Sequence, residues 1–204
     1  MAASAHKILV ALSRTGSRPS RQSTLNAVEN FSVPGLSWHQ EVISFPLRPG
    51  KSTNHAGGLI DGKTYELLDE AVLVANKKPR QELPGLAPDD LRILPCLEDA
   101  ILYGGVIYNH FGHFLIESLC RLWAYDYFKN YNFKIGFYAP WGKPRYLYRN
   151  NFVNQVFRGF NIPLDSIHFL DRPLRLKQVV VPCQRYGFDY LGHPDHEFLR
   201  FIKS

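Results

Sequence analysis

Cysteine, methionine and long apolar runs are scarce in this sequence, and each shortage excludes a class of protein. The 204 residues include three cysteines and a single methionine. Cys96, Cys120 and Cys183 are far apart and form no C-x-x-C pair, which argues against a disulfide scaffold or a structural zinc site and favours a reducing compartment. No apolar run approaches the roughly 18 residues that a membrane helix needs. We therefore expect a cytoplasmic protein without a transmembrane segment, in solution or at a membrane surface.

Acidic side chains are absent from residues 1–28, where Lys7, Arg14, Arg18 and Arg21 are basic and serine and threonine recur. This composition is typical of organelle transit peptides, although a solvated tail is the simpler interpretation. We expect residues 1–28 to form a flexible basic tail and residues 29–204 to form one domain. Organelle targeting by the tail stays open.

The overall composition is that of a globular chain with a mild positive charge. Hydrophobic residues make up 45% of the chain and aromatic residues 14%, which argues against wholesale disorder. The formal net charge of +6 favours anionic ligands or surfaces. Because no long Lys/Arg run and no RNA-binding signature accompanies this charge, we expect no nucleic-acid partner.

Hydrophobic patterning predicts that strands and helices alternate over the second half of the chain. Predicted strands are Gln40–Leu47, Thr64–Leu68, Ala71–Ala75, Ala100–Tyr108, Phe133–Tyr138, Ser166–Leu170 and Gln178–Val181. Predicted helices are Gly112–Phe128, Tyr148–Phe160 and Pro194–Lys203, and Lys77–Pro95 is predicted to be a loop. This alternation predicts an α/β layered domain with some parallel strand pairing.

The predicted helix Gly112–Phe128 carries one narrow polar strip between apolar faces. His113, Glu117 and Arg121 are spaced four residues apart, so they stack on one side of a helix, with His110 about one turn earlier. A carboxylate at Glu117 is placed to accept a hydrogen bond from His113, which fixes the imidazole tautomer and raises its basicity. Arg121 is placed to keep Glu117 ionised through a bidentate contact.

Two other interpretations of this strip stay open. Glu117 and Arg121 form a structural ion pair in one of them, with His113 a core histidine that is satisfied by hydrogen bonds. In the other, His110, His113 and Glu117 bind a metal ion. The spacing is not the H-E-x-x-H pattern, and no further ligand stands in a diagnostic position, so we expect no metal.

The same residues resemble a known family. The block "NHFGHFLIESLCRLWA", residues 109–124, is similar to the signature near the start of the glycosyltransferase family 61 domain in its bacterial form. A second block, "VVVPCQRYGFDYLGHPDHEFL", residues 179–199, is similar to a later block of that family. The matching residues are Gly104, Gly105, His110, Gly112, His113, Phe114, Leu115, Glu117, Ser118, Arg121, Leu122, Trp123, Val181, Pro182, His193, Pro194 and His196. The resemblance covers residues 98–204.

The resemblance implies an inverting transferase of the GT-B type, which has two Rossmann-like halves and a cleft between them. It implies a nucleotide-sugar donor and a glycan or glycoprotein acceptor. The absence of a D-x-D motif agrees, because a metal-dependent transferase of the other common type usually needs one. On this basis the catalytic residues are His113 as the base, Glu117 and Arg121. The substrate-binding residues are Asn109, His110, His193 and His196.

Family members are about twice as long, and their C-terminal half supplies most of the nucleotide site. We therefore expect this chain to be the acceptor-side half, to need a C-terminal half or a second copy as partner, and to lack turnover alone. Three other functions stay open: a non-catalytic carbohydrate-binding or partner-binding module, a metal-dependent hydrolase, and a basic nucleic-acid binder.

Overall fold

The structure is a computed structural model and describes residues 33–51, 55–75, 78–85, 91, 93–139, 151–185 and 196–203. The predicted tail at residues 1–28 and His193 lie outside these residues. The strands are β1 (Leu36–Arg48), β2 (His55–Asp61), β3 (Val74–Ala75), β4 (Lys78–Pro79), β5 (Gln81–Glu82), β6 (Cys96–Leu97), β7 (Ala100–Val106), β8 (Phe133–Tyr138), β9 (Ile167–Phe169) and β10 (Leu174–Pro182). The α-helices are α4 (Phe111–His113), α5 (Tyr125–Phe128), α6 (Asn151–Gly159) and α7 (His196–Lys203). Short 3-10 or π turns are η2 (Asp69–Ala71), η3 (Phe114–Ser118), η4 (Leu122–Ala124) and η7 (Leu164–Ser166).

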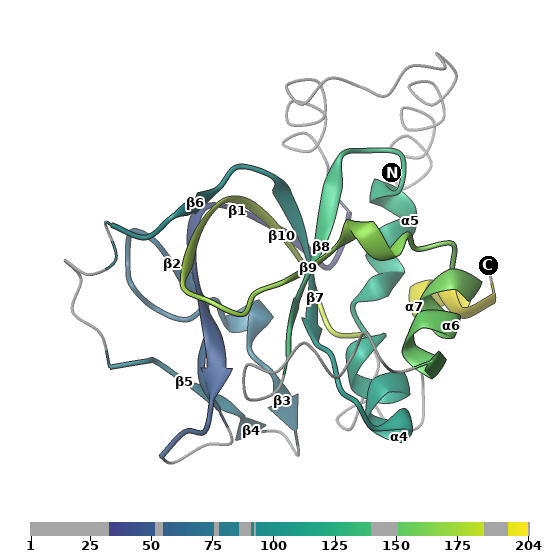
Figure 1. Cartoon of the computed structure of the whole chain (residues 1–204), viewed down its shortest axis with the longest axis horizontal. Helices are drawn as coiled ribbons and strands as arrows, with labels where there is room; N and C mark the ends of the chain where they lie inside the picture. Colours follow the sequence, from purple (N-terminus) through teal and green to yellow (C-terminus); the bar gives the residue numbers. More distant parts are fainter. Residues whose placement is uncertain are drawn as a thin grey trace.

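Eight of the described strands form one mixed sheet in the order β5-β2-β1-β10-β7-β8-β9, with β6 also paired to β10. Strands β10, β7, β8 and β9 run parallel to one another, while β1 is antiparallel to both β10 and β2. The described helices lie on one side of β7, β8 and β9, and the curved strands β1, β2 and β10 extend to the other side (Figure 1). The expected α/β layered fold with parallel pairing is therefore confirmed.

Strand β7 separates two hydrophobic cores, because its residues are buried on both faces. Leu102 points into the core on the helix side, whereas Ile101 and Tyr103 belong to the core on the other side. A strand covered on both faces reads in sequence as a continuous apolar run, which is why the predicted strand Ala100–Tyr108 matches β7 closely. Between β9 and β10, Leu170 and Leu174 pack into the same core as Ile101 and Tyr103, which we call the second core.

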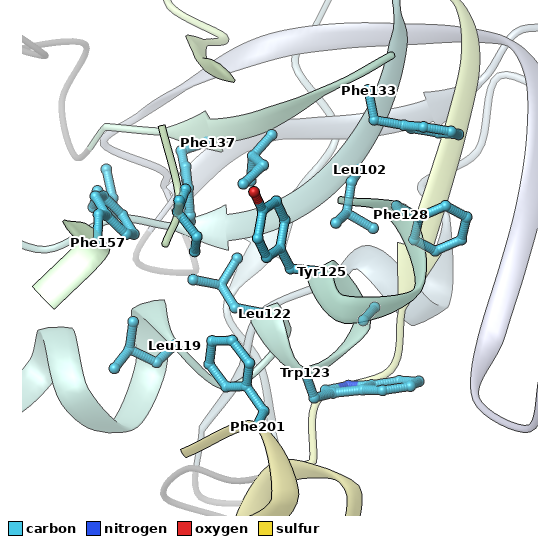
Figure 2. Close-up of a cluster of buried hydrophobic side chains, with 14 of the residues drawn as sticks. Leu102, Leu119, Leu122, Trp123, Tyr125, Phe128, Phe133, Phe137, Phe157 and Phe201 are labelled. Atoms are coloured by element: carbon cyan, nitrogen blue, oxygen red, sulfur yellow. The ribbon is translucent and has the colours of Figure 1, made fainter. Parts of the chain in front are cut away.

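The helix-side core is dominated by aromatic side chains. Leu122 and Tyr125 point toward the strands that carry Leu102 and Phe137, while Phe201 of α7 lies on the opposite side of Leu122 (Figure 2). Tightly packed aromatic residues contribute large buried areas, and edge-to-face pairs add to them. This core holds the segment that carries the predicted site against the sheet.

The predicted continuous helix Gly112–Phe128 is wrong. The chain instead forms α4, the π turn η3, the 3-10 turn η4 and α5 in succession. Local hydrogen bonds accompany the change: the Tyr108 amide donates to Ser118 Oγ at 2.9 Å, and Cys120 Sγ donates to the Glu117 carbonyl at 2.9 Å. Leu119, Leu122, Trp123 and Ala124 are all buried. The break in the helix therefore lies within a buried segment of the chain.

Two of the predicted strands are shorter in the structure than expected, and the predicted loop contains short strands. Asp61 Oδ1 accepts hydrogen bonds from the Lys63 and Thr64 amides, so a turn replaces the start of the predicted strand Thr64–Leu68 and leaves Leu67 as an isolated bridge. The predicted strand Ala71–Ala75 keeps only β3. Residues 77–95, predicted as a loop, contain the two-residue strands β4 and β5. The other predicted elements agree with the structure within a few residues wherever it describes them.

A bulge in β7 marks the place where the strand leads into the predicted site. The register between β7 and β8 shifts between Tyr103 and Gly105, and Gly105 has a φ of 90°. A Cβ atom on Gly104 would lie 2.4 Å from the Phe137 ring. Bulges of this kind bend a strand and redirect the residues that follow it.

We expect Gly104→Ala to lower the free energy of unfolding by about 1–3 kcal/mol, because the added methyl group overpacks the site against Phe137. Gly159→Ala is the matched control: a Cβ atom on Gly159 would meet no other atom within 4 Å, and the residue ends helix α6. Alanine favours helix over glycine by up to about 1 kcal/mol, so the control should be neutral or stabilising. Urea unfolding of both variants measures the difference, and equal effects would contradict the packing argument.

Two strand histidines are kept neutral by burial. His55 is buried in β2 and His168 is half-buried in β9, and burial lowers the pKa of both imidazoles. The unfolded chain therefore takes up protons below about pH 6.5 that the folded chain does not. Stability due to these two groups is complete above that pH and is lost as the pH falls.

We expect the free energy of unfolding to be lower at pH 5.5 than at pH 7.5 and to change less in the His55→Gln/His168→Gln variant. Urea unfolding at the two pH values measures both differences. The comparison between the variant and the original chain separates the contribution of these histidines to the pH dependence from that of the carboxylates. Most carboxylates titrate below this pH range. An equal pH dependence in the two proteins would contradict the assignment.

Candidate functional site

The site lies at one edge of the parallel part of the sheet. Strands β7, β8, β9 and β10 are parallel, so their carboxyl ends meet at the same edge. Ligands of open α/β sheets bind outside the carboxyl ends of the strands. The chain leaves β7 at Val106 and within a few residues reaches Tyr108, His110 and His113. The predicted site residues of the first block are therefore placed where this fold class holds its ligands.

His113 and Glu117 form the contact that their spacing predicts, although the helix around them is broken. His113 Nδ1 lies 3.4 Å from Glu117 Oε1. The side chain of His113 is 45% exposed and that of Glu117 only 9%, so an accessible imidazole contacts a buried carboxylate. A carboxylate that faces Nδ1 favours the tautomer with a proton there and leaves Nε2 with its lone pair. This arrangement suits a general base.

Two further rings complete what we call the His113 cluster, which consists of Tyr108, His110, His113 and Glu117. The ring centroids of Tyr108 and His113 are 5.4 Å apart, and those of His110 and His113 are 5.1 Å apart. Burial raises the pKa of the Tyr108 phenol well above its usual range, and the charge of Glu117 and a hydrogen bond to it add to the rise. Tyr108 therefore stays a neutral donor beside the carboxylate.

The predicted contact between Arg121 and Glu117 is wrong. The Arg121 guanidinium is buried and donates hydrogen bonds to three backbone carbonyls, those of Glu70 at 2.8 Å, Val72 at 3.5 Å and Pro182. It also lies over the ring of Tyr103, 5.3 Å from its centroid. The break in the helix after η3 turns Arg121 away from the strip. These contacts give Arg121 a structural role, and its predicted catalytic role stays a prediction.

The remaining predicted binding residues are placed in different ways. Asn109 and His110 are exposed, and the His110 ring lies 5.1 Å from the His113 ring. His196 opens α7, and this helix packs on η4 rather than on the turn that carries His113. His193 lies outside the described residues.

Tyr108 and the His39–Glu70 pair were missed by the sequence analysis. Tyr108 has one signal in the sequence: it follows a buried strand just past a glycine pair, at a carboxyl strand end. His39 Nε2 and Glu70 Oε1 are 2.6 Å apart and join β1 to η2. Burial raises the pKa of Glu70, but hydrogen bonds from its own backbone and from His39 outweigh burial and lower it overall. No local pattern in the sequence signals this long-range pair.

The described part of the chain contains no group of three or more His, Cys, Asp or Glu side chains arranged to hold a metal ion. The metal interpretation of His110, His113 and Glu117 therefore has no geometric support. No helix within the described ranges has both the length and the apolar character needed to cross a membrane.

Comparison with protein-family models, with curated proteins and with solved structures finds no match to this chain. The fold and the site thus define the class on their own. This is an α/β protein with a mostly parallel mixed sheet and a histidine–carboxylate pair at the carboxyl edge of its strands.

We expect Arg121→Met to lower the free energy of unfolding by about 3 kcal/mol or more, because three backbone carbonyls lose a charged donor. Arg175→Met is the matched control: Arg175 forms an exposed ion pair with Glu41 at 2.8 Å, and such pairs contribute about 1 kcal/mol or less. Urea unfolding at neutral pH measures both. A loss for Arg121→Met no larger than that of the control would contradict the structural role.

Proposed function

We propose that this chain is the acceptor-side half of an inverting glycosyltransferase and that His113 takes the proton from the acceptor hydroxyl. The observation that supports this proposal most directly is the contact between His113 Nδ1 and the buried Glu117 carboxylate at the carboxyl edge of the sheet. The family resemblance of the two sequence blocks adds the substrate classes, a nucleotide-sugar donor and a glycan or glycoprotein acceptor.

The proposed chemistry uses Nε2 of His113, the ring nitrogen that does not face Glu117. With the Nδ1 proton directed at Glu117, the lone pair on Nε2 accepts the hydroxyl proton as the acceptor oxygen attacks the anomeric carbon. The bond from that carbon to the diphosphate breaks, and the electron pair leaves with the nucleotide. Glu117 stabilises the imidazolium that forms. In this proposal the exposed residues Asn109 and His110 bind neighbouring acceptor hydroxyls, with the His110 ring against that of His113.

The layered sheet is compatible with one Rossmann-like half of a GT-B fold. In this proposal the donor nucleotide is held mainly by a second half, supplied by a C-terminal segment or a second copy. Electrostatic help for the leaving diphosphate is usually a large part of such catalysis, and we assign it to that second half. The net charge of +6 also favours an anionic donor.

We expect His113→Ala to lower kcat for sugar transfer by about 10²- to 10⁴-fold, the range for removal of a general base. Transfer from a panel of nucleotide sugars to a panel of saccharides, in a preparation that contains the second half, measures the rates. His168→Gln is the control, because it removes a histidine that lies on β9, outside the His113 cluster. Equal transfer by His113→Ala and the original chain would refute the role of His113.

A non-catalytic carbohydrate-binding module is the second candidate, and one observation favours it. Phe111 is 58% exposed next to His110, and its ring is fixed edge-on against Phe152 with the centroids 5.7 Å apart. An exposed, oriented aromatic ring beside polar groups suits stacking against a sugar. Thermal unfolding separates the candidates, since a saccharide at 100 times its Kd stabilises the fold by about 2.7 kcal/mol. Stabilisation by saccharides without any transfer activity would favour the module.

A further inference from the structure

The Glu117 carboxylate is contacted by two side chains of different chemistry. His113 Nδ1 approaches Oε1 at 3.4 Å, and the Tyr108 phenol is near enough to the same carboxylate for Glu117 to raise the pKa of the phenol. The side chain of Glu117 is only 9% exposed, so water has little access to replace either partner. Because a buried carboxylate adopts the orientation that its donors impose, removal of one donor changes how it meets the other.

Tyr108 is itself held firmly in place. Its backbone amide donates to Ser118 Oγ at 2.9 Å, which ties the end of β7 to the π turn that carries Glu117. Its side chain packs against the second core. The ring lies 5.4 Å from the His113 ring at an angle of 37°, so it also limits the tilt of the imidazole. A short loop thus fixes the tyrosine and the carboxylate relative to each other.

We propose that Tyr108 is a positioning residue whose phenol holds Glu117 against Nδ1 of His113 and thereby fixes the imidazole tautomer. The inference rests on the proposed function, in which Nε2 of His113 must be unprotonated to accept the acceptor proton. Tyr108 touches Glu117 and His113 and acts on the reaction only through them. Ser118 acts one step further away, because its hydroxyl accepts from the Tyr108 backbone and does not contact the carboxylate.

The phenol is suited to this role because it stays protonated. Burial and the neighbouring carboxylate raise the pKa of Tyr108 well above its usual range. Its hydrogen bond to Glu117 is therefore preserved over the whole range in which an imidazole exchanges protons with substrate. A second histidine at the same position would lose or gain a proton in that range.

Nitrogen NMR of the full chain tests the inference without any substrate, because the ring ¹⁵N shifts of a histidine report which nitrogen carries the proton. We expect His113 in the original chain to be mainly the Nδ1–H tautomer. Tyr108→Phe should shift it toward the Nε2–H tautomer, and Glu117→Gln should do so at least as far. The double variant should resemble Glu117→Gln alone, since Tyr108 acts through the carboxylate.

Tyr127→Phe is the matched control, because it removes another phenol–carboxylate hydrogen bond, from Tyr127 to Glu197 Oε2 at 3.0 Å. It should leave the His113 tautomer unchanged. A normal tautomer in folded Tyr108→Phe, with an altered one in Glu117→Gln, would overturn the inference. If Tyr108→Phe does not fold, fluorotyrosine at position 108 keeps the ring and makes the phenol a stronger hydrogen-bond donor. This replacement should raise the fraction of His113 in the Nδ1–H tautomer. An unchanged fraction would also overturn the inference.

Kinetics separate this inference from the proposed function. If His113 is the base, Tyr108→Phe lowers kcat by about tenfold and changes KM little, because the residue does not touch substrate. If transfer is seen and Tyr108→Phe leaves kcat unchanged, positioning by Tyr108 is refuted while the proposed function stands. If no nucleotide sugar supports transfer even when the second half is present, the proposed function fails, and the tautomer measurements still decide whether Tyr108 positions Glu117.

Discussion

The guanidinium of Arg121 joins three parts of the chain that are far apart in sequence. It donates to the carbonyls of Glu70 and Val72 near η2 and to that of Pro182 at the end of β10. Gly105 leaves room for it, since a Cβ atom there would lie 3.3 Å from Arg121 Cδ. A buried cation needs this many acceptors to offset its desolvation. The bulge in β7, the end of β10 and the turn η2 are therefore held in one arrangement.

This arrangement also sets the position of the His113 cluster. Arg121 lies three residues beyond the end of the π turn η3 at Ser118, and its hydrogen bonds anchor the chain that follows the turn. Ser118, the last residue of the turn, accepts a hydrogen bond from the backbone amide of Tyr108 and so ties the turn to the end of β7. π turns occur often at functional sites. Here the turn buries Glu117 and leaves His113 accessible.

The sequence allowed prediction of the fold class, of the central strands and of the His113–Glu117 contact, because these depend on local patterns. Strand β7 reads as a continuous apolar run, and the spacing of His113 and Glu117 brings them together in an α-helix or a π turn. The partners of Arg121 were not predictable, since Glu70 and Pro182 are 51 and 61 residues away. The helix break was missed for the same reason: helical periodicity is local, whereas burial on all sides depends on α7 and the sheet. Tyr108 was assigned to a strand, and its contact with Glu117 appears only once the bulge has redirected the chain.

The pairing of β1 with β10 has a consequence for how the protein folds. Leu36 lies opposite Pro182 and Ser44 opposite Leu174, so an early segment of the described chain pairs with a late one. β10 then joins β1 to the parallel strands β7, β8 and β9. During synthesis, β1 and β2 emerge long before their central partner exists, and such long-range pairing slows folding and prolongs exposure of unpaired strand edges. Completion of the sheet is therefore a late event, and a nascent chain that stops before β10 presents an open edge to chaperones.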